Sequence, residues 1–337
     1  MTYTWLKYIT IFGSAVETVN ILFLGGAKRV SLAERLISAG KKRQLNVAIF
    51  SYELSSLVPI MQVGRVIKGK RWSDPDLIKH LEDTITNHDI NVVLPFVDPA
   101  INICAILKCV LAQTTLRSVF IPVCSKAVCD TFFDKKIARD WFSNKEICHA
   151  EAVDPLQRPT FPFIAKPRKG SASSGIHVVR NEQECQRTMA LITVDDYLFE
   201  RYLKATEYTV DCYLDRHGKA ISVVPRVRLE TQGGESIRSK TVSHTGVESL
   251  SNLILAQDEF RGPITIQILE DQKTNQLFAM EVNLRFGGGV LTSIAAGADS
   301  ADFLFADYLG DSLMPVTDWE PNLLMMRTFR EYYISCN

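Results

Sequence analysis

The stretch Ile264-Thr-Ile-Gln-Ile-Leu-Glu-Asp-Gln-Lys-Thr-Asn-Gln-Leu-Phe-Ala-Met-Glu-Val-Asn-Leu-Arg285 predicts two paired strands and a site at their end. Apolar residues recur along Ile264–Leu269 and again along Leu277–Val282, which is typical of strands joined as a hairpin. Such a hairpin brings three oxygen-bearing side chains together, those of Gln267, Glu281 and Asn283. Hard oxygen ligands suit a Mg²⁺ ion that also bridges phosphates. These three residues are therefore the predicted metal ligands.

The residues after the hairpin add positive charge and a flexible loop. Arg285 lies two residues beyond Asn283 and shares its strand face, so we expect it to stabilise negative charge. Gly287-Gly288-Gly289 follows and can approach a substrate closely. Upstream, His244 and a basic segment could bind a substrate carboxylate or form a solvated basic loop, and the sequence leaves both readings open. That segment comprises Arg226, Arg228, Arg238 and Lys240.

A second polar stretch, Lys166-Pro-Arg-Lys-Gly-Ser-Ala-Ser-Ser-Gly175, lies between two predicted strands. It is not a P-loop, because no helix follows and the Gly-Lys-Ser/Thr ending is missing. Its small residues still let backbone N–H groups approach phosphate oxygens, and Lys166 can supply positive charge. A flexible hairpin loop without a ligand is the alternative interpretation.

Two glutamates follow in Leu198-Phe-Glu-Arg-Tyr-Leu-Lys-Ala-Thr-Glu-Tyr-Thr-Val210. The carboxylates of Glu200 and Glu207 can accept from ribose hydroxyls or an adenine amino group, and the main chain between them can pair with a purine edge. A solvated pair of acidic side chains is the alternative.

Taken in order, these motifs resemble the ATP-grasp enzymes, and most closely their carbamoyl-phosphate-synthase-like branch, over roughly residues 21–310. The resemblance implies that Lys135 and Lys166 contact phosphates and that Lys169–Gly175 is the glycine-rich lid, with Lys169, Ser171, Ser173, Ser174 and Gly175 as its contact residues. Glu200 and Glu207 match the carboxylates for adenine and ribose, and Tyr202 and Leu203 match the adenine hinge. Gln267, Glu281 and Asn283 match the metal ligands, and Arg285 and Lys166 match the catalytic residues. A glutamine at 267 is typical of this branch, whereas many family members have an acidic residue there.

The resemblance also implies a reaction. ATP would phosphorylate a carboxylate to an acyl phosphate, an amine would attack it, and Mg²⁺, or Mn²⁺ in its place, would bridge the phosphates. The implied partners are a small carboxylate, such as an amino acid, and an amine, with no nucleic acid and no membrane; a homodimer is compatible with it. The alternatives are a carboxylase that forms carboxy-phosphate and an ATP-binding regulatory protein without turnover.

The first third of the chain predicts a parallel α/β sheet. Ile21–Leu24, Asn46–Phe50 and Asn91–Phe96 are strand-like and alternate with helical spacing, which predicts helices on both faces. The turn Gly25-Gly26-Ala27-Lys28-Arg29 lacks the G-x-G-x-x-G spacing of a dinucleotide site, so we discount an oxidoreductase. Asp98, past the third strand, could bind a ligand or cap the next helix.

The remainder predicts an α+β region with many close strands and a helix over Thr131–Asn144. Together with the resemblance, this implies a doubly wound parallel sheet followed by an ATP-grasp fold of two α+β subdomains. The predicted divisions are an extension (1–20), a Rossmann-like pre-ATP-grasp domain (21–124), a small lid subdomain (125–195) and a C-terminal subdomain with the metal site (196–337).

Composition agrees with an ordinary globular protein. The chain has 337 residues, 46% of them hydrophobic, and 38 basic residues balance 38 acidic ones, which argues against a protein whose main task is to neutralise nucleic acid or an anionic membrane. Eight cysteines are too sparse for a disulfide scaffold. From these features and the lack of a long apolar run we expect a cytoplasmic protein.

Overall fold

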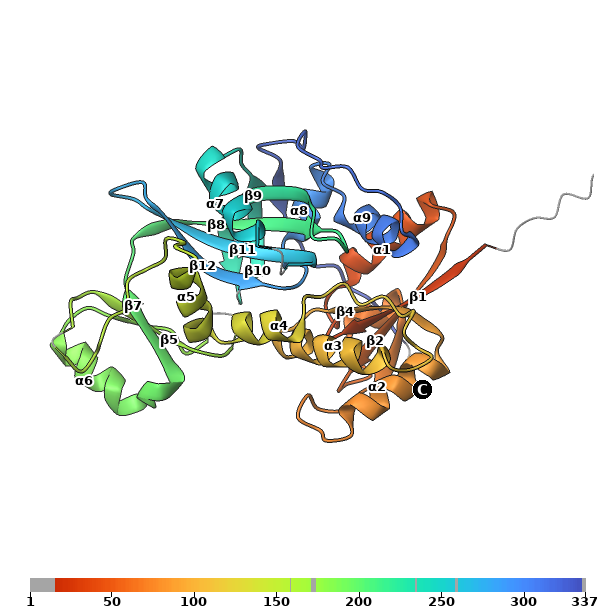
Figure 1. Ribbon diagram of the computed structural model, residues 1–337, viewed down its shortest axis with the longest axis horizontal. Coiled ribbons are helices and arrows are strands. Elements are labelled where there is room, and N and C mark those ends of the chain that lie inside the picture. Colours follow the sequence, from red (N-terminus) through yellow and green to blue (C-terminus); the bar gives the residue numbers. More distant parts are fainter. Residues whose placement is uncertain (1–15, 158, 171–173, 234, 258–259, 335–337) are drawn as a thin grey trace, which may run out of the picture.

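The computed structural model describes residues 16–334 except 158, 171–173, 234 and 258–259. Three sheets follow one another along the length of the molecule, with a large sheet between a parallel sheet and a small one (Figure 1). The mixture of a parallel N-terminal sheet and two antiparallel sheets confirms the predicted fold class. Ser171 and Ser173 of the predicted lid lie outside the described residues. None of the described helices is long and apolar enough to cross a membrane.

The N-terminal sheet is parallel and has four strands. Their order is β3 (Arg65–Lys68), β2 (Asn46–Glu53), β1 (Thr18–Leu24) and β4 (Ile90–Pro95). Helix α1 (Val30–Lys42) packs on one face, while α2 (Leu77–Asn87) and α3 (Asp98–Leu111) pack on the other. A short 3₁₀ helix, η1 (Pro59–Gln62), precedes β3. Strand β1 begins three residues before the predicted strand, because Val19 is also fully buried and pairs with β2.

One predicted helix is wrong in its extent. The segment predicted as a single helix over Thr131–Asn144 forms two, α4 (Lys126–Phe133) and α5 (Lys135–Asn144). The break falls at Asp134, whose backbone is extended and whose carboxylate accepts a hydrogen bond from the Lys136 amide. An aspartate in this conformation caps a new helix rather than continuing the old one.

The small sheet is antiparallel and has its own core. Its strand order is β6 (His177–Val179), β5 (Phe163–Pro167) and β7 (Tyr197–Arg201). Helix α6 (Glu182–Leu191) and the 3₁₀ helix η2 (Val194–Asp196) connect β6 to β7. The buried side chains beneath it, Phe163, Ala165, Val179, Cys185 and Phe199, form a cluster separate from the two large cores.

The large sheet has six strands, all antiparallel to their neighbours. Their order is β12 (Leu277–Asn283), β11 (Gly262–Asp271), β8 (Ala205–Leu214), β9 (Ala220–Gln232), β10 (Glu235–Thr241) and β13 (Leu324–Met326). Helices α7 (Thr245–Leu255), α8 (Val290–Ala295) and α9 (Ser300–Leu309) complete this region. The predicted hairpin of β11 and β12 is confirmed, and Gln267 lies directly opposite Glu281.

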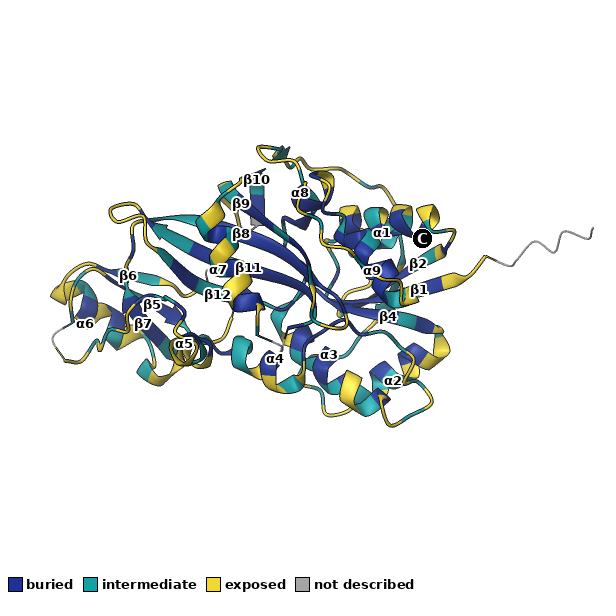
Figure 2. Ribbon diagram, turned by 45° about the horizontal axis from the view of Figure 1, so that its top comes forward, coloured by how far each residue is buried: buried dark blue, intermediate teal, exposed yellow. Residues whose placement is uncertain are grey.

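The N-terminal and large sheets share both large cores. One core joins Leu22 and α3 to Val210 and Ile266 of the large sheet, and the other joins Phe23 and α1 to α9. Buried residues therefore run without interruption from one sheet to the other (Figure 2). Arg43, the C-cap residue of α1, reinforces the contact through two hydrogen bonds to Asp302 at 2.6 and 2.7 Å and one to Asp311 at 2.9 Å. We infer that these two sheets form one rigid body to which the small sheet is attached.

The described cysteines are free thiols, and most are buried. Burial raises the pKa of Cys124 to about 11, against weaker opposing contributions from the Arg261 amide and Lys108. Such a thiol stays protonated at neutral pH and is unreactive.

Removal of a large side chain of α9 from the shared core should destabilise the protein. Phe305 is fully buried, and its ring lies against Gly40 of α1. We expect Phe305→Ala to lower the free energy of unfolding by about 3–5 kcal/mol. Leu309 on the same helix is 41% exposed, and its replacement by alanine should cost less than about 1 kcal/mol. Urea unfolding measures both, and equal losses would show that α9 is not part of the shared core.

Candidate functional site

The predicted site residues come together at one face of the large sheet. Glu281 lies opposite Gln267, Gln267 opposite Thr209, and Thr209 opposite Arg226, so four neighbouring strands contribute one polar row. The residues between them, such as Val210 and Ile266, belong to the apolar core. Because strand side chains alternate between faces, the same strands build the core and the site.

A cavity of about 280 Å³ lies between this face and the small sheet, and we call it the lysine cavity. The predicted residues in its lining are Lys135, Lys166, Ser174, Glu200, Tyr202, Leu203, Glu207 and Glu281. Apolar side chains such as Ile164, Leu269 and Met280 complete the wall. A cavity with basic groups, carboxylates and apolar surface is suited to a nucleotide.

Lys166 and Glu200 form a buried ion pair in this cavity. They come from the neighbouring strands β5 and β7, and Lys166 Nζ lies 2.6 Å from Glu200 Oε2. Both residues are less than one-tenth exposed, at 8% and 6%. Removal of either member would leave the other as a buried charge without its partner, so the ammonium group of Lys166 is held in place only while Glu200 is present.

Lys135 links three parts of the site. Its backbone amide donates to the Arg168 carbonyl at 2.9 Å, and its Nζ donates to the Gly170 carbonyl at 2.8 Å. The same Nζ lies 3.4 Å from Glu281 Oε1. Lys135 is therefore held between the predicted lid and the predicted metal ligand.

Asp134 fixes the start of α5 and hence the position of Lys135. Its carboxylate accepts from Arg168 at 2.6 and 3.1 Å as well as from the Lys136 amide. Burial alone would raise the pKa of the Asp134 carboxyl, but these hydrogen bonds outweigh burial and lower its pKa below the ordinary value. Asp134 was not among the site residues predicted from the sequence.

A second cavity, of about 250 Å³, lies on the other side of the polar row, and we call it the arginine cavity. Four arginines contribute to its lining, namely Arg29, Arg226, Arg228 and Arg285. Gln267, Thr209 and the loop Gly287–Gly289 contribute as well. Arg238 of the basic segment lies elsewhere, paired with Glu230 on the surface, and His244 caps α7.

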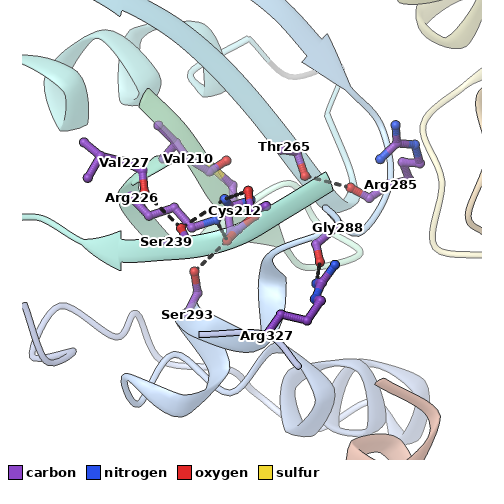
Figure 3. A network of polar contacts seen from close by, with 12 residues as sticks. Val210, Cys212, Arg226, Val227, Ser239, Thr265, Arg285, Gly288, Ser293 and Arg327 are labelled. Atoms are coloured by element: carbon purple, nitrogen blue, oxygen red, sulfur yellow. Dashed lines mark hydrogen bonds and ion pairs between the residues drawn. The ribbon is translucent and has the colours of Figure 1, made fainter. Parts of the chain in front are cut away.

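Arg226 packs directly against the glycine loop Gly287–Gly289. Its guanidinium is buried, donates to Asp211 at 2.8 and 3.4 Å and contacts Ser239, while Ser293 also donates to Asp211 (Figure 3). A Cβ atom on Gly289 would lie 2.6 Å from Arg226 Cζ. Arg327 holds the loop from another side through a 2.7 Å bond to the Gly288 carbonyl. The loop thus requires glycine for close approach to Arg226.

Arg285 forms an ion pair that links the end of the large sheet to α3 beside the N-terminal sheet. Its guanidinium donates to Asp98 at 3.0 and 3.1 Å and to the Asn283 side-chain oxygen at 3.4 Å. Val97 is the N-cap of α3 and makes no side-chain capping bond, so Asp98 binds Arg285 instead of capping the helix by itself. Asn283 lines a small space of about 20 Å³ with Asp98, Lys135 and Glu281 rather than either large cavity.

Two predicted contacts are not among the residues that line the lysine cavity. Lys169 lies over the Phe133 ring, with Nζ 5.9 Å from its centroid. Gly175 has a φ of +73° and lies beside Pro167 and Tyr197. Their roles in binding remain predictions.

Comparisons with known proteins agree with this geometry. A family model described as "ATP-grasp in the biosynthetic pathway with Ter operon" matches residues 193–327. D-alanine–D-alanine ligases of Rickettsia canadensis and Rickettsia felis are 25% and 24% identical over 202 and 209 residues. Those matches cover 52% of this chain and only 55% and 61% of the two ligases.

Solved structures extend the likeness to nearly the whole chain. The biotin carboxylase domain of Hydrogenobacter thermophilus 2-oxoglutarate carboxylase has a TM-score of 0.72 at 15% identity and covers 90% of this chain and 73% of its own. N5-carboxyaminoimidazole synthetase from Staphylococcus aureus has a TM-score of 0.69 at 17% identity and covers 91% and 82%. Residues 193–327 thus match an ATP-grasp family model, and the solved structures show that the chain has the ATP-grasp fold. The branch within the superfamily remains a prediction.

The residues of this site fit a magnesium ion that binds together with phosphates. Mg²⁺ is usually held by one or two carboxylates together with substrate phosphates and water. Glu281 supplies one carboxylate, whose contact with Lys135 is long at 3.4 Å. Gln267 donates through its amide nitrogen to Glu207 at 2.9 Å, which leaves its oxygen as an acceptor. Among the described residues no cluster of three or more His, Cys, Asp or Glu residues could hold a metal without such help.

The glycine loop gives a matched test. Gly289→Ala places a methyl group within 3.0 Å of a buried guanidinium that Asp211 holds in place, and we expect a loss of about 1–3 kcal/mol in unfolding free energy. Gly288→Ala meets only Arg29 Nη1, at 3.6 Å, and should cost less than about 0.5 kcal/mol. Urea unfolding compares the two, and a tolerated Gly289→Ala would contradict the packing described.

The Asp134–Arg168 pair predicts a pH dependence. Asparagine is an equally good N-cap, so Asp134→Asn removes mainly the charge, and we expect a loss of about 1–2 kcal/mol at pH 7. A lowered carboxyl pKa stabilises the fold above the unfolded value, so the difference from wild type should shrink as the pH falls from about 5 toward 2. Denaturant unfolding across this range measures it, with Asp140→Asn on the exposed side of α5 as control. A difference that does not change with pH would contradict the ion pair.

Proposed function

We propose that this protein is an ATP-dependent ligase that joins a small carboxylate to an amine with release of ADP and phosphate. The observation that carries the proposal is the convergence of Lys135, Lys166, Glu200 and Glu281 on one cavity, beside a second cavity lined by arginines. The activities of the ligases that resemble part of this chain support it.

The lysine cavity would take ATP. Lys135 and Lys166 would neutralise phosphate oxygens, and Glu200 and Glu207 would lie near the nucleoside beside Tyr202 and Leu203. Glu281, with Gln267 and Asn283, would hold Mg²⁺, which when bound neutralises the phosphates and orients the terminal one. The small sheet has its own core, so it can move as a unit when nucleotide enters.

The reaction would proceed in two displacements. A carboxylate oxygen attacks the terminal phosphorus, the bond to the ADP oxygen breaks, and an acyl phosphate forms. The amine then attacks the acyl carbon, the bond to phosphate breaks, the nitrogen loses a proton, and an amide and phosphate remain. Most of such catalysis comes from fixed positive groups that compensate the negative charge of the transition state, so no covalent enzyme nucleophile is required.

The N-terminal sheet gives a physical reason against dinucleotide binding at its glycine turn. The Glu53 carboxylate accepts hydrogen bonds from the Gly26 and Ala27 amides and from Ser51. Those amides are the donors that a pyrophosphate would need. Burial raises the pKa of Glu53, while these hydrogen bonds oppose the rise.

Nucleotide selectivity tests the proposal first. Mg-ATP should stabilise the protein against heat, by about 2.7 kcal/mol at a hundredfold excess over Kd, whereas NAD should not.

Glu281→Gln should abolish ADP formation without loss of fold, because it removes the one predicted carboxylate ligand. Glu182→Gln, at an exposed position of α6, is the control. ADP release is measured with pooled carboxylates, with and without pooled amines.

The outcomes separate the alternatives. ADP release that needs a carboxylate and an amine supports the ligase. Release that needs bicarbonate instead would indicate a carboxylase, and binding of Mg-ATP without release under any condition would indicate a regulatory protein. Stabilisation by NAD and not by Mg-ATP would overturn the assignment altogether. The homodimer remains a prediction.

A further inference from the structure

Arg228 lies at the boundary between the two cavities. It is near the end of β9, and it contributes to the lining of both the lysine cavity and the arginine cavity. Its side chain is 20% exposed, so most of the guanidinium is enclosed by protein. A group passing between a nucleotide in one cavity and an acceptor in the other would meet this residue.

A hydrogen-bonded partition holds Arg228 in place. Arg228 Nη2 donates to Glu207 Oε2 at 3.0 Å, and Gln267 Nε2 donates to Glu207 Oε1 at 2.9 Å. The three residues come from the neighbouring strands β9, β8 and β11. The guanidinium is therefore oriented by the sheet before any ligand binds.

Two polar atoms of this partition have no partner in the described part of the chain. They are Arg228 Nε and Thr209 Oγ1, and each is shielded from solvent. Thr209 is 3% exposed, also contributes to the lining of the arginine cavity and lies directly opposite Gln267. Buried polar groups in proteins are nearly always paired, and a ligand with acceptor oxygens in this wall would supply the missing partner to both.

Arg285, which is predicted to stabilise negative charge, differs from Arg228 in its hydrogen bonds. Arg285 uses Nε and Nη2 on Asp98 and Nη1 on the Phe286 carbonyl. Arg228 donates from Nη2 to Glu207, and its Nε has no partner in the described part of the chain. An arginine fork with a neighbouring hydroxyl is suited to an oxyanion such as a carboxylate or a phosphoryl group.

We propose that Arg228 and Thr209 form an oxyanion site at the boundary of the two cavities, which binds one of the two reacting groups of the phosphoryl transfer. This inference rests on the proposed function, because that function supplies both the phosphoryl group and the carboxylate that accepts it. The ligand is either the transferred phosphoryl group or the substrate carboxylate, which share the same recognition chemistry.

Binding experiments without turnover test this site. The affinity for MgADP is measured alone and with orthovanadate, which stands in for the transferred phosphoryl group. The affinity for the Mg²⁺ complex of a non-hydrolysable ATP analogue is measured alone and with acetate, which stands in for the carboxylate. Enhancement by vanadate assigns the site to the phosphoryl group, and enhancement by acetate assigns it to the carboxylate.

The variants separate this role from a structural one. Arg228→Lys keeps the charge but loses Nε–H and the fork, and it should reduce the enhancement about tenfold while MgADP alone binds within about twofold of wild type. Thr209→Val should reduce the enhancement severalfold, and Thr209→Ser should restore it. Arg238→Lys, on the surface of β10, is the matched control and should change neither affinity.

Three results would overturn the inference. They are the absence of any enhancement in wild type, full enhancement in Arg228→Lys, and an equal loss of MgADP affinity in that variant, which would show that Arg228 only supports Glu207. Failure of wild type to bind MgADP at all would instead contradict the proposed function. The two failures are therefore distinguishable.

Discussion

The cross-strand row of Glu281, Gln267, Thr209 and Arg226 is the constraint on which the rest of the site depends. These residues lie opposite one another on four neighbouring strands, so the register of the large sheet alone determines their separation. A slip of one residue in any pair would exchange the polar row with the apolar residues that form the core. Packing of the core therefore fixes the chemistry of the site.

The two cavities beside this row differ in what surrounds them. The arginine cavity lies between the N-terminal and large sheets, which share their cores and are joined by ion pairs such as that of Arg285 and Asp98. The lysine cavity lies between the large sheet and the small sheet, whose core is separate. We infer that the acceptor side is preorganised and that the nucleotide side adapts on binding, because a ligand can order only what is free to move.

The sequence predicted those features that short-range patterns determine. The hairpin of β11 and β12 was predictable because alternation and spacing occur within one short stretch, and its register then paired Gln267 with Glu281. The single helix predicted over Thr131–Asn144 was wrong because apolar spacing continues across Asp134, while the break depends on that residue's capping geometry and its bond to Arg168.

Features that depend on distant residues were not predictable in the same way. Arg226 and Arg228 were left open between a binding role and a solvated loop, because only the pairing of β9 with β8 shows which face they occupy. Asp98 was open for a similar reason, since its partner Arg285 lies 187 residues away. Thr209 and Asp211 went unnoticed, although they follow Glu207 at successive two-residue intervals on one strand, which was a signal that could have identified them.

A crystal structure with Mg²⁺ and a non-hydrolysable ATP analogue tests the central claim most directly. The account predicts the triphosphate between Lys135 and Lys166, the metal on Glu281, and the terminal phosphate at the polar row facing Arg228. A nucleotide bound instead at the carboxyl ends of the N-terminal strands, with its phosphates on the Gly25–Arg29 turn, would contradict it.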